Sequence, residues 1–171
     1  MTTPIQNQSD ENTTRWFVAS LTDFFVNTVN PTLPTPIPPI SVTGYSLNSD
    51  ENQDHIEMRI QGPYEKDTSG GGWLSVEVPL SFMMTFRQDK VKDMFSLDRW
   101  LGVYKDALRK PIEIRKKGSG VGDDDSLIGC LTPKVSKREL IRVDRYGFTD
   151  GNVPVQQATV VAVLDTWLPW S

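Results

Sequence analysis

The chain has 171 residues and a mass of 19.3 kDa, which is the size of about one domain. Its net charge is −4, and it contains one cysteine and one histidine, which excludes an internal disulfide and a structural zinc site built from thiolates and imidazoles. No segment approaches the ~18 uncharged apolar residues of a membrane span, and the polar, acidic start lacks the pattern of a signal peptide, so we expect no membrane partner.

The first predicted element is a helix over residues 13–29. Its large apolar side chains follow one another at intervals of four, three and one residues, the period of an amphipathic helix: Phe17, Leu21, Phe24 and Phe25. Pro31 disfavours helical geometry in the residue before it, so the helix should end near Asn30. Residues 1–12 precede this helix as a polar N-terminal tail.

Residues 30–44 predict a proline-rich extended arm. Five of the twelve prolines lie between Pro31 and Pro39, and a polyproline-like segment cannot enter the middle of a sheet. The apolar side chains of Ile37 and Ile40 need cover. A surface linker is the favoured interpretation, followed by an arm that grips a neighbouring subunit and then by a ligand for an SH3-type domain.

Two segments of alternating polarity predict strands on either side of a glycine-rich tip at residues 69–72. Apolar side chains alternate with polar ones over residues 55–61 and again over residues 74–86. At ~3.3 Å per residue the second strand would be about 40 Å long, roughly twice the common length, so part of it should leave its own domain. Pro79 lacks a ladder donor and predicts an edge strand or a bulge.

The second half of the chain predicts one helix and four strands. Apolar side chains recur at helical spacing over residues 94–108, and Pro111 closes that helix. The strands are predicted over residues 112–115, 127–131, from 141, and 153–168, with a mobile charged loop between the first two. The last strand is apolar on both faces at residues 160–164, so we place it at the sheet centre, with helices or another subunit covering both faces.

These elements predict a single α+β domain over residues 1–171, with a mixed, mostly antiparallel sheet, a long β-hairpin and two flanking helices. Because so long an apolar strand exceeds what one molecule of this size would cover, we expect copies of the chain to cover one another in a ring. The side chains expected at this subunit interface come from the long strand and the tryptophans: Trp73, Leu74, Val76, Val78, Leu80, Phe82, Met84, Trp167 and Trp170.

Patterns for catalysis and ligand binding are weak. Cys130 and His55 are the one possible nucleophile and base, but Cys130 lies in an apolar segment typical of a buried strand, where a thiol is inert. The aspartates at 123–125 lack the alternating spacing of calcium loops. The glycines within residues 118–122 lack the Gly-Lys-Ser or Gly-Lys-Thr ending of a phosphate-binding loop. We therefore expect a non-enzymatic protein with no metal and no cofactor.

Charge is distributed unevenly along the chain. Residues 1–86 hold 3 basic and 10 acidic groups, a net charge of −7, whereas residues 87–171 hold 15 and 12, a net charge of +3. Two portions of opposite charge suit head-to-tail contacts between copies. For the basic groups between Arg109 and Arg145, a solvated sheet face is favoured over contact with an acidic neighbour or with nucleic acid. A pI near 5.0 argues against a dedicated nucleic-acid binder.

The order of helix, proline loop, two long strands around a glycine tip, helix and terminal strands is accompanied by four characteristic segments. They are residues 59–64 (RIQGPY), 73–78 (WLSVEV), 126–131 (SLIGCL) and 157–160 (QATV). In this order and in these segments the chain, from Thr13 to Leu168, resembles the tail-terminator and tail-completion (minor tail) proteins at the neck of tailed bacteriophages.

The resemblance implies a structural virion protein, assembled in the host cytoplasm, that forms a homo-oligomeric ring of usually six copies at the neck. Such a ring terminates the tail tube, joins the tail to the head connector and lets genomic DNA pass without reading its sequence. The implied partners are other copies of the chain, the tail-tube protein, and the head connector or stopper protein. A head-to-tail connector (adaptor or stopper) and a tail-tube subunit are close alternatives. A small cytoplasmic enzyme using Cys130 and His55 is the alternative of another class.

Overall fold

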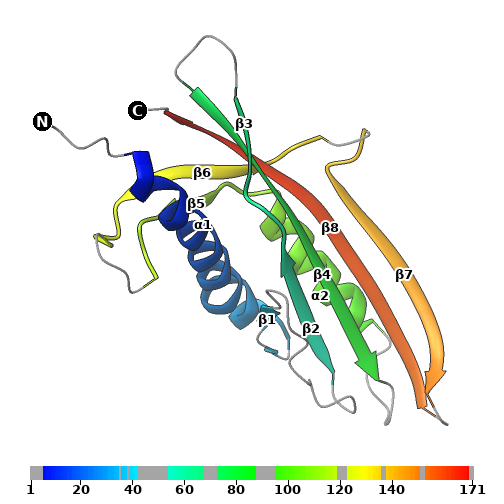
Figure 1. Cartoon of the computed structure of the whole chain (residues 1–171). Coiled ribbons are helices and arrows are strands. Elements are labelled where there is room, and N and C mark those ends of the chain that lie inside the picture. Colours follow the sequence, from blue (N-terminus) through cyan, green and yellow to red (C-terminus); the bar gives the residue numbers. More distant parts are fainter. Residues whose placement is uncertain are drawn as a thin grey trace, which may run out of the picture.

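The computed structural model describes residues 6–34, 36–37, 39–41, 54–67, 73–87, 95–118, 123–135, 138–150 and 153–169. Within these residues two α-helices accompany a curled, mostly antiparallel sheet of eight strands, which confirms the predicted α+β class (Figure 1). The helices are α1 (Gln6–Asp23), which continues as a π-helix (Phe24–Val29) and a 3-10 turn (Asn30–Thr32), and α2 (Ser96–Leu108). The strands are β1 (Ile40–Ser41), β2 (His55–Ile60), β3 (Tyr64–Asp67), β4 (Trp73–Arg87), β5 (Ile112–Arg115), β6 (Leu127–Pro133), β7 (Ile141–Asp150) and β8 (Val153–Pro169).

The two longest strands, β4 and β8, lie side by side at the centre of the sheet. They are antiparallel and stay in register from the pair Trp73–Pro169 to the pair Arg87–Val155. Beyond β4 lie β3 and β2, with β1 parallel to β2; beyond β8 lie β7 and β6, with β5 next to β6. The central place of the last strand is confirmed. The prediction that part of residues 74–86 leaves its own domain is wrong, because β4 is paired along its whole length.

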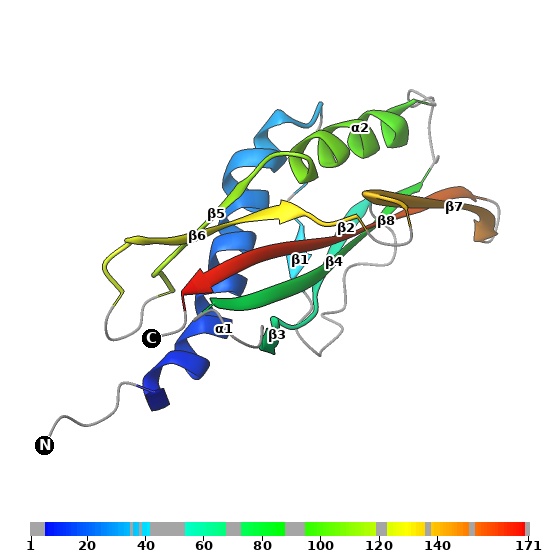
Figure 2. The same cartoon turned by 90° about the horizontal axis from the view of Figure 1, so that it is seen from above.

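One face of β4 and β8 packs under α2 (Figure 2). Side chains alternate between the two faces of a strand, so the even-numbered residues of both strands point to this side and form one core with the helices. Aromatic rings meet there: the Phe82 ring centroid of β4 lies 4.5 Å from that of Phe25 and 4.7 Å from that of Tyr104 in α2. The apolar alternation of the long strand is therefore satisfied inside its own subunit.

The first helix is confirmed, and it starts earlier than predicted, because α1 begins at Gln6 within the polar tail. The buried side chains of this segment recur every four residues: Phe17, Leu21, Phe25 and Val29. An α-helix turns once in ~3.6 residues, so a four-residue spacing drifts around its surface. The wider turns of the π-helix (Phe24–Val29) counter this drift and return the last two side chains to the core.

The described part of the proline-rich arm lies against its own chain. The helical segment ends in the 3-10 turn that contains Pro31, as that proline predicts. Leu33 is buried, Ile37 packs against the core, and β1 joins the sheet beside β2. The arm is thus a border of its own sheet rather than a linker without contacts.

Pro79 lies in the interior strand β4, so the prediction of an edge strand is wrong. An irregularity does lie beside it, because the register shifts by one residue between the pairs Ile60–Leu80 and Tyr64–Glu77, with two residues opposite one as in a β-bulge. Its carbonyl oxygen accepts a hydrogen bond from the Gln61 N–H at 2.9 Å. The side of Pro79 that lacks a donor therefore faces the junction where β2 ends and β3 begins. Gly62 in this junction has a φ of +82°, and a Cβ there would lie 2.7 Å from the Tyr64 backbone nitrogen. The junction therefore requires glycine at position 62. Because the regular strand pairing is interrupted here, the N–H that Pro79 lacks is not needed for a hydrogen bond between strands.

The second half of the chain follows the predicted pattern. α2 buries Leu97, Leu101, Tyr104 and Leu108 as its spacing predicts, while Met94 lies outside the described residues. Trp100 is also buried in α2, although the sequence did not single it out. β6 runs two residues beyond the predicted end, to Pro133, where it reaches β8. Among the described residues, neither helix combines the length and the apolarity that a bilayer crossing needs.

Candidate functional site

The side chains predicted at the subunit interface divide into two groups. Val76, Val78, Leu80, Phe82 and Met84 are at most 1% exposed in the single chain. Side chains with no remaining surface cannot touch another subunit, so these five predictions are wrong: the alternating pattern located a buried face, and α1 and α2 of the same chain bury it. Leu74 is half-buried and also packs against this core.

The tryptophans give a different result. The Trp167 side chain is 56% exposed and remains a candidate contact residue. Trp167 is paired with Ser75 of β4 and points to the face opposite α2. The side chain of Trp73 and the whole of Trp170 lie outside the described residues.

The face of the sheet turned away from α2, here called the open face, is formed by the odd-numbered residues of β4 and β8. Its centre has an alternation of small polar and apolar groups in which none is fully exposed and none is fully buried: Pro79, Ser81, Met83, Thr159, Val161 and Val163. Where Thr85 and Gln157 lie opposite each other, the Gln157 amide donates a hydrogen bond to the Thr85 hydroxyl at 3.0 Å. The prediction that both faces of β8 are covered is therefore confirmed for the α2 face, whereas cover of the half-exposed face by another subunit stays a prediction.

Ion pairs flank the centre of the open face on both sides. On β2, the Arg59 guanidinium contacts the Glu57 carboxylate at 2.9 Å. On β7, Arg142 contacts Asp144 at 2.9 Å. Arg59 and Arg142 lie in one row across the sheet, and the two acids lie in the next row, because the four strands stay in register. Each charge is thus offset by its neighbour on the same strand.

A third charged group lies further along the open face, where Glu77 of β4 is paired with Asp165 of β8. Two lysines offset this pair of acids: the Lys66 ammonium contacts Glu77 at 2.8 Å, and Lys134 donates a second hydrogen bond to the same carboxylate. The bonds from Lys134 and then Lys66 hold the pKa of Glu77 below its usual 4.5, and Glu77 in turn raises the pKa of Lys134. Glu77 and Lys134 thus each favour the charged form of the other.

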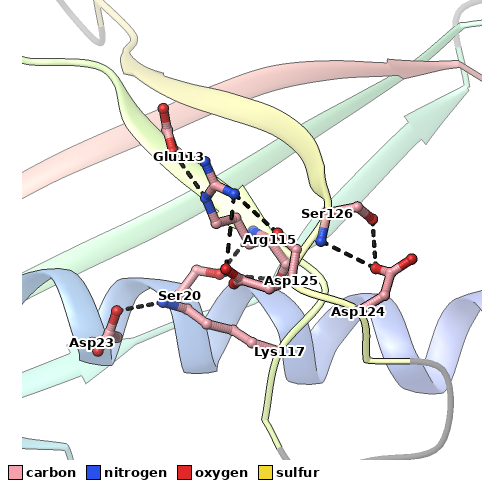
Figure 3. Close-up of polar contacts among 8 residues, drawn as sticks. All are labelled: Ser20, Asp23, Glu113, Arg115, Lys117, Asp124, Asp125 and Ser126. Carbon is pink, nitrogen blue, oxygen red and sulfur yellow. Dashed lines mark hydrogen bonds and ion pairs between the residues drawn. The ribbon is translucent and has the colours of Figure 1, made fainter.

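The aspartates considered as a cation site are each engaged by a different partner in the hairpin of β5 and β6. Asp123 accepts hydrogen bonds from the Arg15 guanidinium at 2.6 and 2.9 Å and from the Trp16 indole N–H at 2.7 Å. Asp124 accepts from the Ser126 hydroxyl and backbone N–H, which lowers the pKa of Asp124 (Figure 3). Within the described residues, no three His, Cys, Asp or Glu side chains form a group suited to a metal ion.

The same hairpin is fastened to α1 by further polar contacts. The Ser20 hydroxyl of α1 accepts a hydrogen bond from the Arg115 N–H at 3.0 Å and donates one to the Arg115 carbonyl at 3.3 Å (Figure 3). Lys117 forms an ion pair with Asp23 at the end of α1 and lowers the pKa of Asp23. Residues 116–118 and 123–126 of the predicted charged loop are thus anchored to the helix, and residues 119–122 lie outside the described residues.

Cys130 and His55 lie far apart, and the environment predicted for Cys130 is wrong. Cys130 is exposed on β6, because β5 and β6 form a two-stranded extension in which one face has no core beneath it. His55 lies on β2, and β4 and β8 separate β2 from β6. Three strand spacings of about 4.8 Å exceed the reach of a hydrogen bond, so the two side chains do not form a nucleophile–base pair within one chain.

The basic side chains between Arg109 and Arg145 mostly contact carboxylates of their own chain. Arg109 contacts Asp106 at 3.3 Å, and Arg115 contacts Glu113 at 2.7 Å. Arg145 reaches α2 and contacts Asp98 at 2.5 Å. The basic region is therefore spread over separate ion pairs and does not form one continuous surface for phosphates.

The sequence did not predict strand β3. Its four residues, YEKD, have no apolar alternation, and its place beside β4 depends on the junction at Gly62. Two exposed tyrosines, Tyr64 of β3 (52% exposed) and Tyr146 of β7 (55% exposed), also went unnoticed. In β3 and in β7 a tyrosine stands next to side chains of alternating charge, and this pattern is the sequence signal that could have indicated both exposed tyrosines.

Comparison of the chain with models of known protein families finds no match. A search among curated proteins also finds none.

Proposed function

We propose that this chain is a structural virion protein of a tailed bacteriophage. Copies of it form a homo-oligomeric ring at the neck, which terminates the tail tube, joins the tail to the head connector and lets DNA pass. The ring has six copies, following the resemblance of the sequence to tail-terminator and tail-completion proteins. The protein is assembled in the host cytoplasm and resides in the virion.

The observation that carries this function is the chemical difference between the two faces of the long sheet. The helices of the same chain cover one face, so each copy folds around its own core. The open face has a centre of small polar and apolar groups and a balanced set of charges: basic Arg59, Lys66, Lys134 and Arg142, and acidic Glu57, Glu77, Asp144 and Asp165. A rigid sheet of this kind suits the wall of a channel.

The charge balance of the open face also suits passage of DNA rather than its capture. Proteins bind DNA mainly by neutralising phosphates with Lys and Arg, and each such contact adds affinity. Here Arg59, Arg142 and Lys134 each contact a carboxylate of their own chain, which reduces their attraction for phosphate. We place the open face toward the channel for this reason.

The connector and tail-tube alternatives also rely on α+β or β-rich rings and differ in their place in the particle. The enzyme alternative has less support, because Cys130 and His55 lie on strands separated by β4 and β8. If the chain were such an enzyme, replacing Cys130 with alanine would abolish an activity of a monomeric protein.

Native mass spectrometry and negative-stain electron microscopy of the purified chain test the assembly. Rings or short tubes of a defined copy number are expected at tens of micromolar protein. A strict monomer at every concentration would contradict the proposed function. In a phage that encodes the chain, deletion of its gene should leave full heads and free tails of abnormal length if it terminates the tail; full heads that leak DNA beside normal tails would indicate a stopper.

A further inference from the structure

Two strands that differ in sequence lie on opposite sides of the central pair β4 and β8: β3 beyond β4, and β7 beyond β8. Among the described strands, β7 pairs with β8 on one of its sides, and β3 pairs with β4 on one of its sides. The outer side of each strand carries backbone donors and acceptors without a described strand beside it. Such edges are templates for pairing with another chain.

The direction of the outward-pointing backbone groups follows from two hydrogen bonds. The Pro79 carbonyl accepts from Gln61 on the β2 side, so the odd-numbered residues of β4 face β2 and β3. Their partners in β3 are Tyr64 and Lys66, which leaves Glu65 and Asp67 with backbone groups directed outward.

The same reasoning applies to the other border. The Val163 carbonyl accepts from the Lys134 N–H at 2.8 Å, so the odd-numbered residues of β8 face β6 and β7. Their partners in β7 are even-numbered, and Val143 and Arg145 therefore direct their backbone groups outward. At both borders, therefore, the backbone groups of odd-numbered residues point outward.

The two borders also agree in direction and in face. β3 is antiparallel to β4, β4 to β8, and β8 to β7, so β3 of one copy placed beside β7 of a copy in the same orientation is antiparallel to it. Glu65 is paired with Val76 and Arg145 with Ala158, both of which are core residues. Pairing of odd-numbered with odd-numbered residues therefore keeps the helices of both copies on one face.

Among the registers that pair odd-numbered residues of β3 with odd-numbered residues of β7, one places opposite charges next to each other. With Tyr64 opposite Tyr146, Glu65 lies opposite Arg145 and Lys66 lies opposite Asp144. Directly opposed pairs of opposite charge stabilise a sheet, and like charges in the same place destabilise it. A shift of two residues in one direction places Lys66 opposite Arg142 instead. A shift in the other direction places Lys66 opposite Tyr146 and Glu65 opposite Gly147, so two charge pairs are replaced by the single pair of Asp67 and Arg145.

The basic members of these pairs, Lys66 and Arg145, each contact one carboxylate of their own chain and have donors left for a second carboxylate. Lys66 contacts Glu77 at 2.8 Å and Arg145 contacts Asp98 at 2.5 Å, and their side chains are 60% and 61% exposed. An ammonium has three donors and a guanidinium has five, so donors remain for the acids of a neighbour.

We propose that a second copy of this chain pairs its β3 with the outer side of β7, in the register of Tyr64 opposite Tyr146. The pairing rests on the proposed ring and names its subunit contact. Because the borders differ, the contact is head-to-tail and repeats from copy to copy. Within one copy, Arg145 of β7 aligns across the sheet with Met84 of β4, whereas Glu65 of β3 aligns with Val76 of β4. Met84 and Val76 are eight residues apart, so placing Glu65 opposite Arg145 displaces each copy by about 26 Å along the strand direction. The joined strands are therefore tilted to the ring axis.

Disulfide crosslinking tests this register. Tyr64 and Tyr146 would form a non-hydrogen-bonded pair with Cα atoms about 4.5 Å apart, within the range that a disulfide spans. Within one chain β4 and β8 separate these positions by three strand spacings, about 14 Å, so a link can form only between copies. In a Cys130→Ala background, which removes the exposed native thiol, the Tyr64→Cys, Tyr146→Cys double variant should give a ladder of covalent oligomers under mild oxidant.

A matched control differs in one position. The Tyr64→Cys, Arg142→Cys variant keeps the same face and the same strands but places the second thiol four residues away along β7, about 13 Å, and should remain largely uncrosslinked. Lys66→Cys with Asp144→Cys tests the same register without altering the tyrosines and should crosslink. Thermal unfolding of each variant monitors the fold.

The outcomes separate this contact from the ring itself. Rings of the Cys130→Ala protein together with crosslinking by both register pairs support the contact. Rings with no crosslinking by either register pair, or with equal crosslinking by the control, overturn the β3–β7 pairing and leave the ring standing. A protein that stays monomeric at all concentrations overturns both the ring and the contact.

Discussion

At the scale of single residues, Gly62 allows β2 and β3 to share one side of β4. Its φ of +82° is strained for other residues, and a Cβ would lie 2.7 Å from the Tyr64 nitrogen and 3.2 Å from the Glu77 carbonyl oxygen. Both contacts are to backbone, which cannot rotate away. Gly62→Ala should therefore lower the free energy of unfolding by about 1–3 kcal/mol, measured by urea denaturation.

Gly102 provides the control within the same chain. It lies on the exposed side of α2, and a Cβ there has no atom within 4 Å. Since glycine in a helix interior is less favourable than alanine by about 0.5–1 kcal/mol, Gly102→Ala should stabilise the protein by that amount. Equal effects of the two substitutions would mean that the junction at Gly62 tolerates a side chain.

Glu77 makes stability depend on pH. Hydrogen bonds from Lys134 and Lys66 lower the pKa of Glu77 from its usual 4.5. A carboxylate with a depressed pKa stabilises the folded state above its unfolded pKa, and this contribution is lost as the pH falls through the folded pKa. Glu77→Gln should cost about 1 kcal/mol or less at pH 7, and the cost should vanish at acidic pH. Urea denaturation at pH 7, 5 and 3 measures it; a cost that stays constant with pH would show that the charge of Glu77 contributes nothing.

At the scale of elements, the sequence predicts those segments whose pattern repeats along the chain. The alternation over residues 74–86 and the helical spacing over residues 94–108 both identify buried faces that the structure contains. The pattern does not reveal what buries a face, so side chains such as Phe82 were assigned to a subunit interface although α2 covers them. Burial by distant parts of the same chain is a property of the tertiary structure.

The expectations for Pro79 and Cys130 failed for one reason, which is that both depended on strand pairing elsewhere in the sheet. Pro79 is tolerated in an interior strand because the segment of the same chain opposite it is the irregular junction between β2 and β3, where the register shifts by one residue after Gln61. Cys130 is exposed although its sequence neighbours are apolar, because β6 departs from the main sheet to pair with β5. The residues adjacent to Pro79 and Cys130 in sequence do not reveal these environments, because strands that are distant in sequence create them.

The outward direction of the Glu65 backbone predicts unequal effects of proline at adjacent positions of β3. Glu65→Pro removes a donor that points away from β4, so it should leave the fold intact and prevent assembly. Lys66→Pro removes a donor that points toward β4 and should destabilise the fold by a few kcal/mol. Thermal unfolding measures the fold, and sedimentation velocity measures assembly. If Glu65→Pro assembles like the unaltered chain, β3 is not the paired border.

At the scale of the whole molecule, the uneven charge of the sequence is partly balanced within one subunit. Lys134 and Lys117, from the basic half, contact Glu77 and Asp23, from the acidic half. Among the charged side chains that stay more than half exposed, Lys66 and Arg145 lie at the two borders of the sheet. Net charge per segment therefore overstates the polarity of the folded subunit, and the register of border residues decides which contacts are complementary.

The location of these charges predicts a difference between folding and assembly in their response to salt. The core of one subunit is apolar, whereas the proposed contact between subunits combines a few backbone hydrogen bonds with exposed ion pairs. Raising the ionic strength from about 0.15 M to about 1 M shortens the screening length from ~8 Å to ~3 Å. Sedimentation velocity in chloride salts should show weaker assembly across this range, while the thermal unfolding midpoint of the dissociated subunit changes by only a few degrees. Assembly that strengthens with salt would instead indicate an interface dominated by apolar contacts, and the charged register of β3 and β7 would then not be its basis.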